Sequence, residues 1–179
     1  MKKTLFTARA AKLAFALIAA CALVTAAPAQ SWNREGLFRA DLTSLNQVPA
    51  VLAPGQGNFV AELHDDGSLS FQLTYSNMSS PATQAHIHFG AGKTNGGVIV
   101  FLCGGQMPAC PASGTVTGVI TAGDVSVLPA SNGDSVIPQG IPPGDFAGLL
   151  EAIRSGDAYV NVHTANFPNG EIRGQIHFR

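Results

Sequence analysis

Short runs of alternating hydrophobic and polar residues follow one another along the chain from about residue 36 to its end. The clearest run is Leu69 to Tyr75, in which Leu, Phe, Leu and Tyr alternate with Ser, Gln and Thr. Successive side chains of a strand point to opposite faces, so this period of two predicts a strand with one buried face. Alternating or continuous hydrophobic runs predict further strands at residues 36–45, 58–63, 84–89, 97–102, 114–121, 159–163 and 172–178.

Turn-forming residues separate the predicted strands. The pairs Asp66-Gly67 and Asn169-Gly170 each lie between two of these runs, and such pairs favour tight hairpins. Residues 128–144 contain four prolines and three glycines, which predicts an irregular connection.

One helix is predicted near residues 145–155. Its hydrophobic residues, Phe146, Leu149, Leu150 and Ile153, recur at helical spacing and form one stripe. Asp145 precedes the helix as an N-cap, and Gly156 follows it as a terminating residue. Many short strands and one helix predict an all-β protein. We expect an antiparallel, Greek-key-like β-sandwich or barrel with this single short α-helix.

The first 29 residues have the pattern of a secretory signal peptide. A basic start is followed by the apolar run Leu13 to Val24, which is short for a membrane span, and by the cleavage pattern Ala27-Pro28-Ala29. We therefore expect cleavage after Ala29, a single β-sandwich domain over residues 30–179, no transmembrane segment in the mature chain, and export to the periplasm or the extracellular space. The alternative is a lipobox at residues 18–21, which would leave Cys21 lipidated.

Removal of the signal peptide changes the charge of the protein. The segment holds four of the ten basic residues and none of the eleven acidic ones. The mature chain is then modestly acidic and has no basic cluster, so we expect no binding to nucleic acid.

Two cysteines remain in the mature chain, Cys103 and Cys110, at the ends of the short segment CGGQMPAC. In an oxidising compartment such a pair is expected to form a disulfide. The alternative is a pair of soft metal ligands.

Three histidines are candidate metal ligands. His86 and His88 are two residues apart in AHIHFG, so they share one face of a strand, and His163 ends the strand YVNVH. If the two strands are neighbours, three imidazoles can converge on a copper or zinc ion. The alternative is that these histidines are polar, solvated or hydrogen-bonded groups on an outer face. We expect His64 and His177 to be solvated.

Glu171 and Arg173 share a face of the last strand. Glu171 is either an acceptor that orients a ligand imidazole or the partner of Arg173 in an ion pair that fixes the hairpin. No nucleophile-elbow, zinc-protease or phosphate-loop motif is present in the sequence, which favours a protein that is not an enzyme.

Nearly the whole mature chain resembles the CHRD domain, a chordin-type domain that is also found in many exported bacterial proteins. The resemblance lies in LTSLNQVPAV, DGSLSFQLTY, AHIHFG, GGVIVFL and, most specifically, YVNVHTANFPNGEIRGQI. It implies a β-rich extracellular module.

A more distant likeness concerns the histidines. HIHFG is similar to the His-x-His-x-Phe-Gly strand of copper-zinc superoxide dismutases, and VNVHT is similar to their late Val-Val-His strand. This likeness implies copper ligation by His86, His88 and His163. The bridging histidine and the zinc ligands of those enzymes have no counterpart here.

We therefore expect an exported module that has a binding or structural role in the cell envelope, with a protein or other envelope partner. The alternative is a copper-binding protein, with or without redox activity.

The signal-peptide interpretation predicts the N-terminus of the exported protein. Expressed in full in a bacterial host with a periplasm, the protein should be recovered with Gln30 as its first residue, as measured by intact mass and N-terminal peptide mass spectrometry. A lipidated Cys21, or a chain that keeps its first 29 residues, would contradict this prediction.

Overall fold

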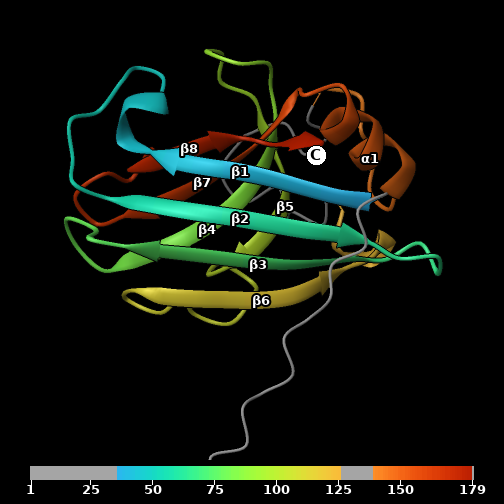
Figure 1. The fold of residues 1–179 in the computed structure, drawn as a ribbon, viewed down its shortest axis with the longest axis horizontal. Helices are drawn as coiled ribbons and strands as arrows, with labels where there is room; N and C mark the ends of the chain where they lie inside the picture. The colour runs from blue at the N-terminus through green and yellow to red at the C-terminus, as the bar shows by residue number, and fades with distance from the viewer. Residues whose placement is uncertain (1–35, 126–138, 179) are drawn as a thin grey trace, which may run out of the picture. The chain divides into compact units, whose positions relative to one another are not determined.

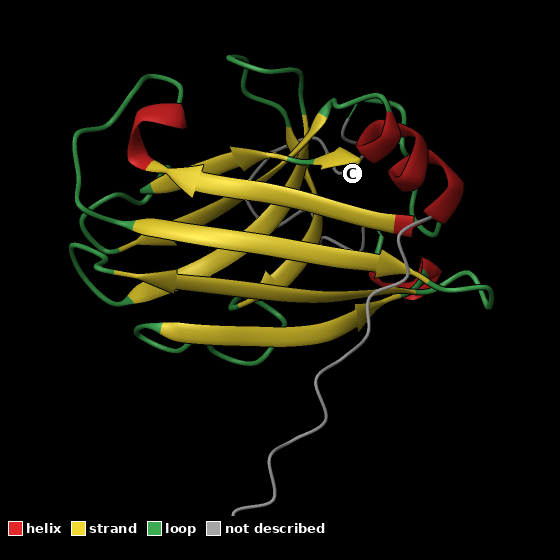
Figure 2. Ribbon diagram, viewed as in Figure 1, coloured by secondary structure: helices red, strands yellow, loops and turns green. Residues whose placement is uncertain are grey.

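The computed structural model describes residues 36–125 and 139–178, so the predicted signal peptide, Cys21 and most of the predicted irregular connection lie outside the described residues. Within the described ranges, nine strands and one α-helix are present (Figure 2). They are β1 (Leu37–Thr43), β2 (Gln56–Leu63), β3 (Leu69–Ser76), β4 (Ala82–Phe89), β5 (Gly97–Cys103), β6 (Gly114–Ile120), α1 (Phe146–Arg154), β7 (Ala158–Thr164), β8 (Ile172–Gln175) and β9 (His177–Phe178). Short 3-10 turns follow β1 and β6.

The strands form one antiparallel sheet in the order β5-β4-β7-β8-β1-β2-β3-β6, and β9 pairs with β1. The sheet curls into a nearly closed barrel. In Figure 1, strands β1, β2, β3 and β6 lie side by side, and β4, β5 and β7 cross behind them. Neighbours that are distant in sequence, such as β4 and β7, are the Greek-key-like feature of the topology. The predicted all-β antiparallel fold is confirmed.

The hydrophobic core lies inside the barrel and follows the alternation of the sequence. Strand β3 buries every second residue, beginning with Leu69, and it pairs with β2 through the predicted Asp-Gly hairpin. Phe59 and Phe71 are diagonal neighbours on these two strands, and their rings are stacked with centroids 6.1 Å apart.

Helix α1 begins as its cap predicts. The carboxylate of Asp145 accepts a hydrogen bond of 2.9 Å from the backbone N–H of Gly148, and the chain leaves the helix at Gly156, where φ is +79°. Leu149 and Ile153 are fully buried, because the helix packs its apolar stripe on β7 and β9.

The end of the chain differs from the prediction. The alternation of residues 172–178 predicts one strand with Ile172, Ile176 and Phe178 in the core. Ile172 and Ile176 are buried, but Phe178 is 55% exposed. The strand breaks after Gln175, and β9 pairs with the beginning of β1, where the rings of Phe178 and Phe38 meet in an edge arrangement.

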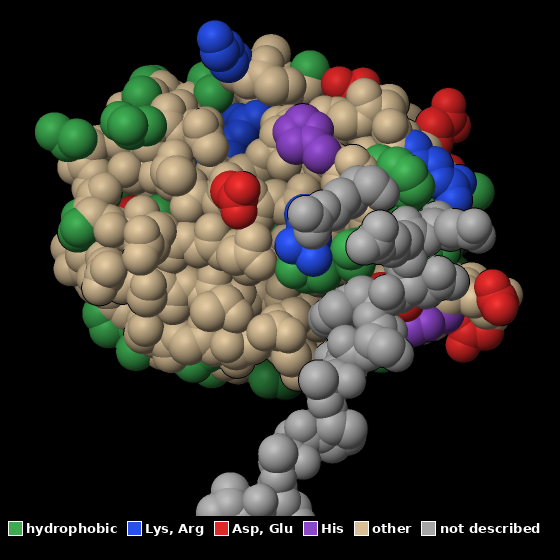
Figure 3. All heavy atoms as spheres, in the orientation of Figure 1, with side chains coloured by type: hydrophobic (Ala, Val, Ile, Leu, Met, Phe, Trp, Pro, Cys, Tyr) green, Lys and Arg blue, Asp and Glu red, His purple; other side chains and the backbone are tan. Residues whose placement is uncertain are grey.

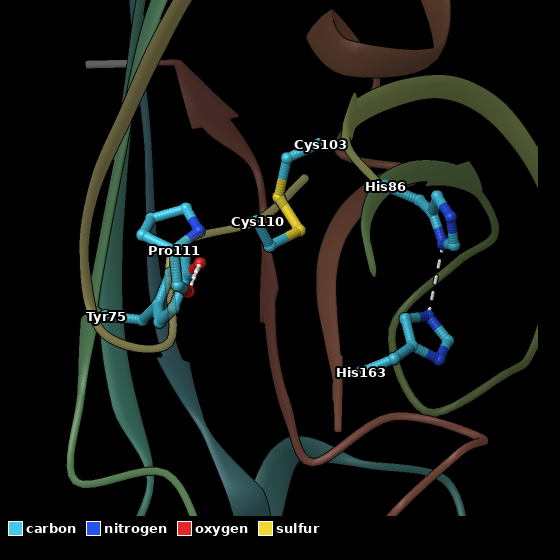
Figure 4. The surroundings of a disulfide bond; sticks show 6 residues. All are labelled: Tyr75, His86, Cys103, Cys110, Pro111 and His163. Atoms are coloured by element: carbon cyan, nitrogen blue, oxygen red, sulfur yellow. Dashed lines mark hydrogen bonds between the residues drawn. A yellow bond between two sulfur atoms is a disulfide. The ribbon is translucent and has the colours of Figure 1, made fainter. Parts of the chain in front are cut away.

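The predicted disulfide between Cys103 and Cys110 is present (Figure 4). It lies where the barrel is open, because β5 and β6 are the two ends of the sheet. The loop that it closes leads from one end to the other, and the Tyr75 hydroxyl holds the loop by donating a 2.6 Å hydrogen bond to the Pro111 carbonyl.

Removal of the disulfide should lower the free energy of unfolding by about 2–3 kcal/mol, because an unfolded chain without the short cross-linked loop has more conformational entropy. The measurement is urea unfolding of the Cys103→Ala/Cys110→Ala variant. Wild-type protein reduced with dithiothreitol is the matched control and should lose the same amount. An unchanged unfolding midpoint in both samples would show that the cross-link does not stabilise the barrel.

Candidate metal centre

Strand pairing brings the three candidate histidines together. His86 and His88 lie on β4, which pairs antiparallel with β7, the strand of His163. Gln84 is the direct partner of His163, so His86 lies diagonally across from it. The ligand nitrogens of the three histidines all lie within 4.8 Å of one another. The neighbouring strands that the metal hypothesis requires are therefore present.

The three rings lie on the outer face of the barrel, as the alternation predicts, but His86 and His88 are not solvated, and His163 is half-buried. His86 is 4% exposed and His88 is 7% exposed. Phe101 of β5 places its ring against His86 at a centroid distance of 4.3 Å, and the loop between β4 and β5 contacts His88 through Gly96. Of the alternative considered from the sequence, the hydrogen bonding is confirmed for all three histidines. Solvation is wrong for His86 and His88, because a glycine-rich loop and a neighbouring strand cover them.

Gly96 has a specific role in this cover. Its carbonyl accepts a hydrogen bond of 3.0 Å from Nδ1 of His88, and its N–H donates to the Tyr159 hydroxyl at 3.2 Å. A Cβ at this position would collide with the Phe89 carbonyl. Only glycine lets the loop come this close to β4.

The hydrogen bonds fix the tautomers of the rings. Nδ1 of His163 lies 2.9 Å from the Pro168 carbonyl, and a carbonyl can only accept, so Nδ1 of both His163 and His88 carries the hydrogen. Nε2 of His163 then has the lone pair that accepts from Nδ1 of His86 at 3.1 Å (Figure 4). It follows that all three Nε2 atoms present lone pairs.

Two of these lone pairs have no partner. Nε2 of His86 and Nε2 of His88 are buried nitrogens without a hydrogen bond. Leaving a buried polar atom unsatisfied costs about 1–3 kcal/mol, and such atoms are rare in folded proteins. Imidazole nitrogens with a free lone pair and an Nδ1–H held by a backbone carbonyl are the arrangement that metal-binding histidines adopt.

All three imidazoles are held neutral. Burial, together with the nearby His163 and His88, lowers the pKa of His86 to about 2. The pKa of His88 is lowered to about 4, mainly by burial, with smaller lowering contributions from His163 and Arg173 and an opposing contribution from the hydrogen bond to Gly96. The pKa of His163 is lowered by burial as well. Neutral imidazole is the form that binds metals.

Tyr159 and Arg173 extend the buried layer on one side of the histidines. The Tyr159 ring is stacked on His88, with ring centroids 4.7 Å apart and planes at 3°. Arg173 places its Cζ 3.4 Å from the centre of the same Tyr159 ring. Although Arg173 is only 2% exposed, its Nη1 has no hydrogen bond, and its Nη2 bonds only to oxygens of Ala91 and Gln175.

Glu171 does neither of the two things considered from the sequence. Its carboxylate accepts hydrogen bonds from Ser79 and from the Thr164 hydroxyl, not from a ligand imidazole, and no ion pair joins it to Arg173. It closes the turn between β7 and β8, which carries the Pro168 carbonyl that orients His163.

Gln47 and Asn161 complete the buried polar layer, joined by a hydrogen bond of 2.7 Å. The remaining histidines lie elsewhere: His64 bonds to Ser70 at the surface, and His177 pairs with Arg39 across β9 and β1 and is exposed. Neither belongs to the cluster of three.

Charged side chains are scattered over the face in Figure 3, with no large patch of one sign. In the described part of the chain, no helix has the length and hydrophobicity to span a membrane.

The family of the chain follows from comparison with known proteins. The CHRD domain family matches residues 38–176. The chain belongs to the CHRD domain family. This membership supports a role as a binding or structural module. Neither the curated proteins nor the solved structures gave a match.

Sequence reasoning found the three histidines of this CHRD domain but not the layer around them. Tyr159, Arg173 and Asn161 occupy outward positions, which a period of two assigns to solvent. The signal for this burial was the glycine-rich segment after Phe89, because glycine lets a loop backbone lie close against a strand, as Gly96 does.

The buried histidines predict that stability falls in acid. Their folded-state pKa lies below the unfolded value of about 6.5, so the unfolded chain binds more protons, and each histidine lowers the free energy of unfolding by up to about 1.4 kcal/mol per pH unit below that value. Urea unfolding of metal-free protein should therefore show a steep loss of stability from pH 7 to pH 4, which continues towards the folded pKa of about 2 for His86.

The matched pair of variants for this test is His86→Gln and His177→Gln. His86→Gln should make the free energy of unfolding fall less steeply from pH 7 to pH 4. His177→Gln, at an exposed position, should leave this slope unchanged. Equal slopes in all three proteins would contradict the neutral buried state of His86.

Proposed function

We propose that this protein is an exported CHRD-domain binding module of the cell envelope, and that its primary ligand is a transition-metal ion, copper or zinc. The ion is bound by His86, His88 and His163. The observation that carries the proposal is the pair of buried, unpartnered Nε2 atoms on His86 and His88 beside a third imidazole.

The donor set fits such an ion. Three neutral imidazoles suit copper and zinc, whereas magnesium and calcium require oxygen ligands. The Gly96 and Pro168 carbonyls hold the rings of His88 and His163 in the required tautomer. For His86 to bind through Nδ1, its hydrogen moves to Nε2; otherwise its ring turns so that Nε2 faces the ion.

The arrangement supports binding more than catalysis. Nε2 of His86 and Nε2 of His88 are buried, and the hydroxyl of Tyr159, whose ring stacks on His88, is already hydrogen-bonded to Gly96. A buried site with three protein ligands holds its ion tightly and exchanges it slowly with solvent. Such a module would store or deliver a metal ion, or use it to stabilise the domain.

Export supports the same proposal. An envelope protein meets metal ions outside the cytoplasm, and its disulfide is compatible with an oxidising compartment. The partner that would receive or supply the ion is an unidentified protein or other component of the envelope.

The proposal predicts one tightly bound ion per chain. Purified protein loaded with Cu(II), Cu(I) or Zn(II) and then dialysed should retain about one equivalent of at least one of these ions by mass spectrometry. An ion present at about 100 times its dissociation constant should raise the free energy of unfolding by about 2.7 kcal/mol.

Ligand variants test which residues hold the ion. His86→Ala and His163→Ala should each weaken binding by on the order of 100-fold or more, since even supporting residues of metal sites cost about 10–100-fold. The exposed His64→Ala and His177→Ala variants are the controls and should bind like the wild type. Unchanged affinity in both ligand variants would eliminate the proposed site.

A further inference from the structure

From the charges around the three histidines, we infer that the site selects the monovalent copper(I) ion over divalent zinc and copper(II). This inference rests on the proposed function, because it specifies the charge of the ion that the same three side chains bind. Four features of the described residues carry it.

The first feature is the absence of negative charge among the ligands. The cluster consists of His86, His88 and His163, with no carboxylate or thiolate within it. A divalent ion bound by three neutral imidazoles keeps its full double charge at a buried site. The desolvation free energy that this costs rises steeply with the magnitude of the charge. A monovalent ion meets a much smaller cost.

The second feature is the positive charge of Arg173. Its guanidinium is always protonated, it is 2% exposed, and among the described residues it has no carboxylate partner. It is separated from His88 by one aromatic ring, because Tyr159 contacts both. A fixed cation so close repels a bound ion in proportion to the ion's charge, and this repulsion is strong where water is excluded.

The third feature is that the buried charge of Arg173 has no carboxylate partner among the described residues, although burying an unpaired charge lowers the stability of the fold. Within the described residues, its guanidinium stacks on Tyr159 and makes long hydrogen bonds to Ala91 and Gln175, and Nη1 is left unsatisfied. The Glu171 carboxylate, two residues away, bonds to Ser79 and Thr164 instead. Within the described residues, no negative charge therefore offsets the positive charge of Arg173 at the histidine site.

The fourth feature is enclosure. Nε2 of His86 and Nε2 of His88 are inaccessible to solvent, and Phe101 covers His86. Zinc held by three protein ligands completes its tetrahedron with a water molecule, and copper(II) favours a larger tetragonal set. Copper(I) accepts low coordination numbers, so three imidazoles satisfy it without a solvent ligand.

The experiment compares the affinities of the purified protein for the three ions. Copper(I) affinity is measured anaerobically, with ascorbate, by competition with bicinchoninate; zinc and copper(II) affinities are measured with chromogenic chelators. X-ray absorption of the copper(I) form reports the ligands. We expect one copper(I) per chain with three nitrogen ligands, bound at least about 100-fold more tightly than either divalent ion.

Variants of Arg173 test the origin of the selectivity. Arg173→Gln removes the charge and should narrow the preference for copper(I) by about tenfold or more, and Arg173→Lys keeps the charge and should retain it. Arg39→Gln is the matched control, because Arg39 is a partly buried arginine on β1, which does not pair with the strands of the three-histidine cluster. If Arg173→Gln does not fold, the wild-type affinities decide alone.

The outcomes separate this inference from the proposed function. Zinc or copper(II) bound at the three histidines as tightly as copper(I) would overturn the inference and leave the metal site standing. Equal selectivity in folded Arg173→Gln and wild-type protein would overturn the role of the charge. Absence of binding for all three ions would overturn the metal site itself, and the inference with it.

Discussion

The antiparallel pairing of β4 with β7 is the interaction on which the candidate site depends. Its register is set by the core, because Ala85, Ile87, Val160 and Val162 must all face the inside of the barrel. A slip by one residue would turn every one of these side chains to the other face. The same register therefore fixes which residues face outward, and it places His86 and His88 beside His163. Burial of hydrophobic side chains on one face thus determines the geometry of polar side chains on the other.

The outer face of this pair of strands is unusual because it is buried too. A second layer of polar groups lies outside the barrel core, covered by Phe101 and by the loop that carries Gly96. Covering imidazoles removes their hydration and keeps them neutral, which lowers the stability of the protein in acid. Among the described residues, two nitrogens without hydrogen-bond partners and an arginine without a carboxylate partner add to this energetic cost. A bound metal ion would convert the unpaired lone pairs into coordination bonds, and its binding energy would add to the folding energy. The CHRD barrel supplies the rest of the stability through its core and its disulfide.

The division between what the sequence predicts and what it does not has a physical origin. Alternation in Leu69 to Tyr75 predicts a half-buried strand, because the period of two and the choice of the buried face are both set by residues that are close in sequence. The disulfide and α1 were predictable for the same reason: each depends on residues close in sequence. The stack of Arg173, Tyr159 and His88 was not, because it depends on strand order and on a loop that folds back over a face. The single strand expected at the end of the chain was wrong at Phe178, since hydropathy does not reveal that the strand breaks after Gln175 and that this side chain is 55% exposed.

Three neutral imidazoles, each with hydrogen on Nδ1 and a bare Nε2, lie beside one another on a covered face of the barrel. Long-range ¹H–¹⁵N correlation spectra of histidine-labelled, metal-free protein test this most directly, because ring ¹⁵N shifts report which nitrogen carries hydrogen. We predict hydrogen on Nδ1 and a bare Nε2 for His86, His88 and His163 at pH 7, and the same state for His86 and His88 down to pH 5, because the pKa of His86 is lowered to about 2 and that of His88 to about 4. Addition of the ion should then shift the ring nitrogens of all three histidines together. Protonation of His86 and His88 near the ordinary histidine pKa, or hydrogen on Nε2 of His88 and His163, would contradict this prediction.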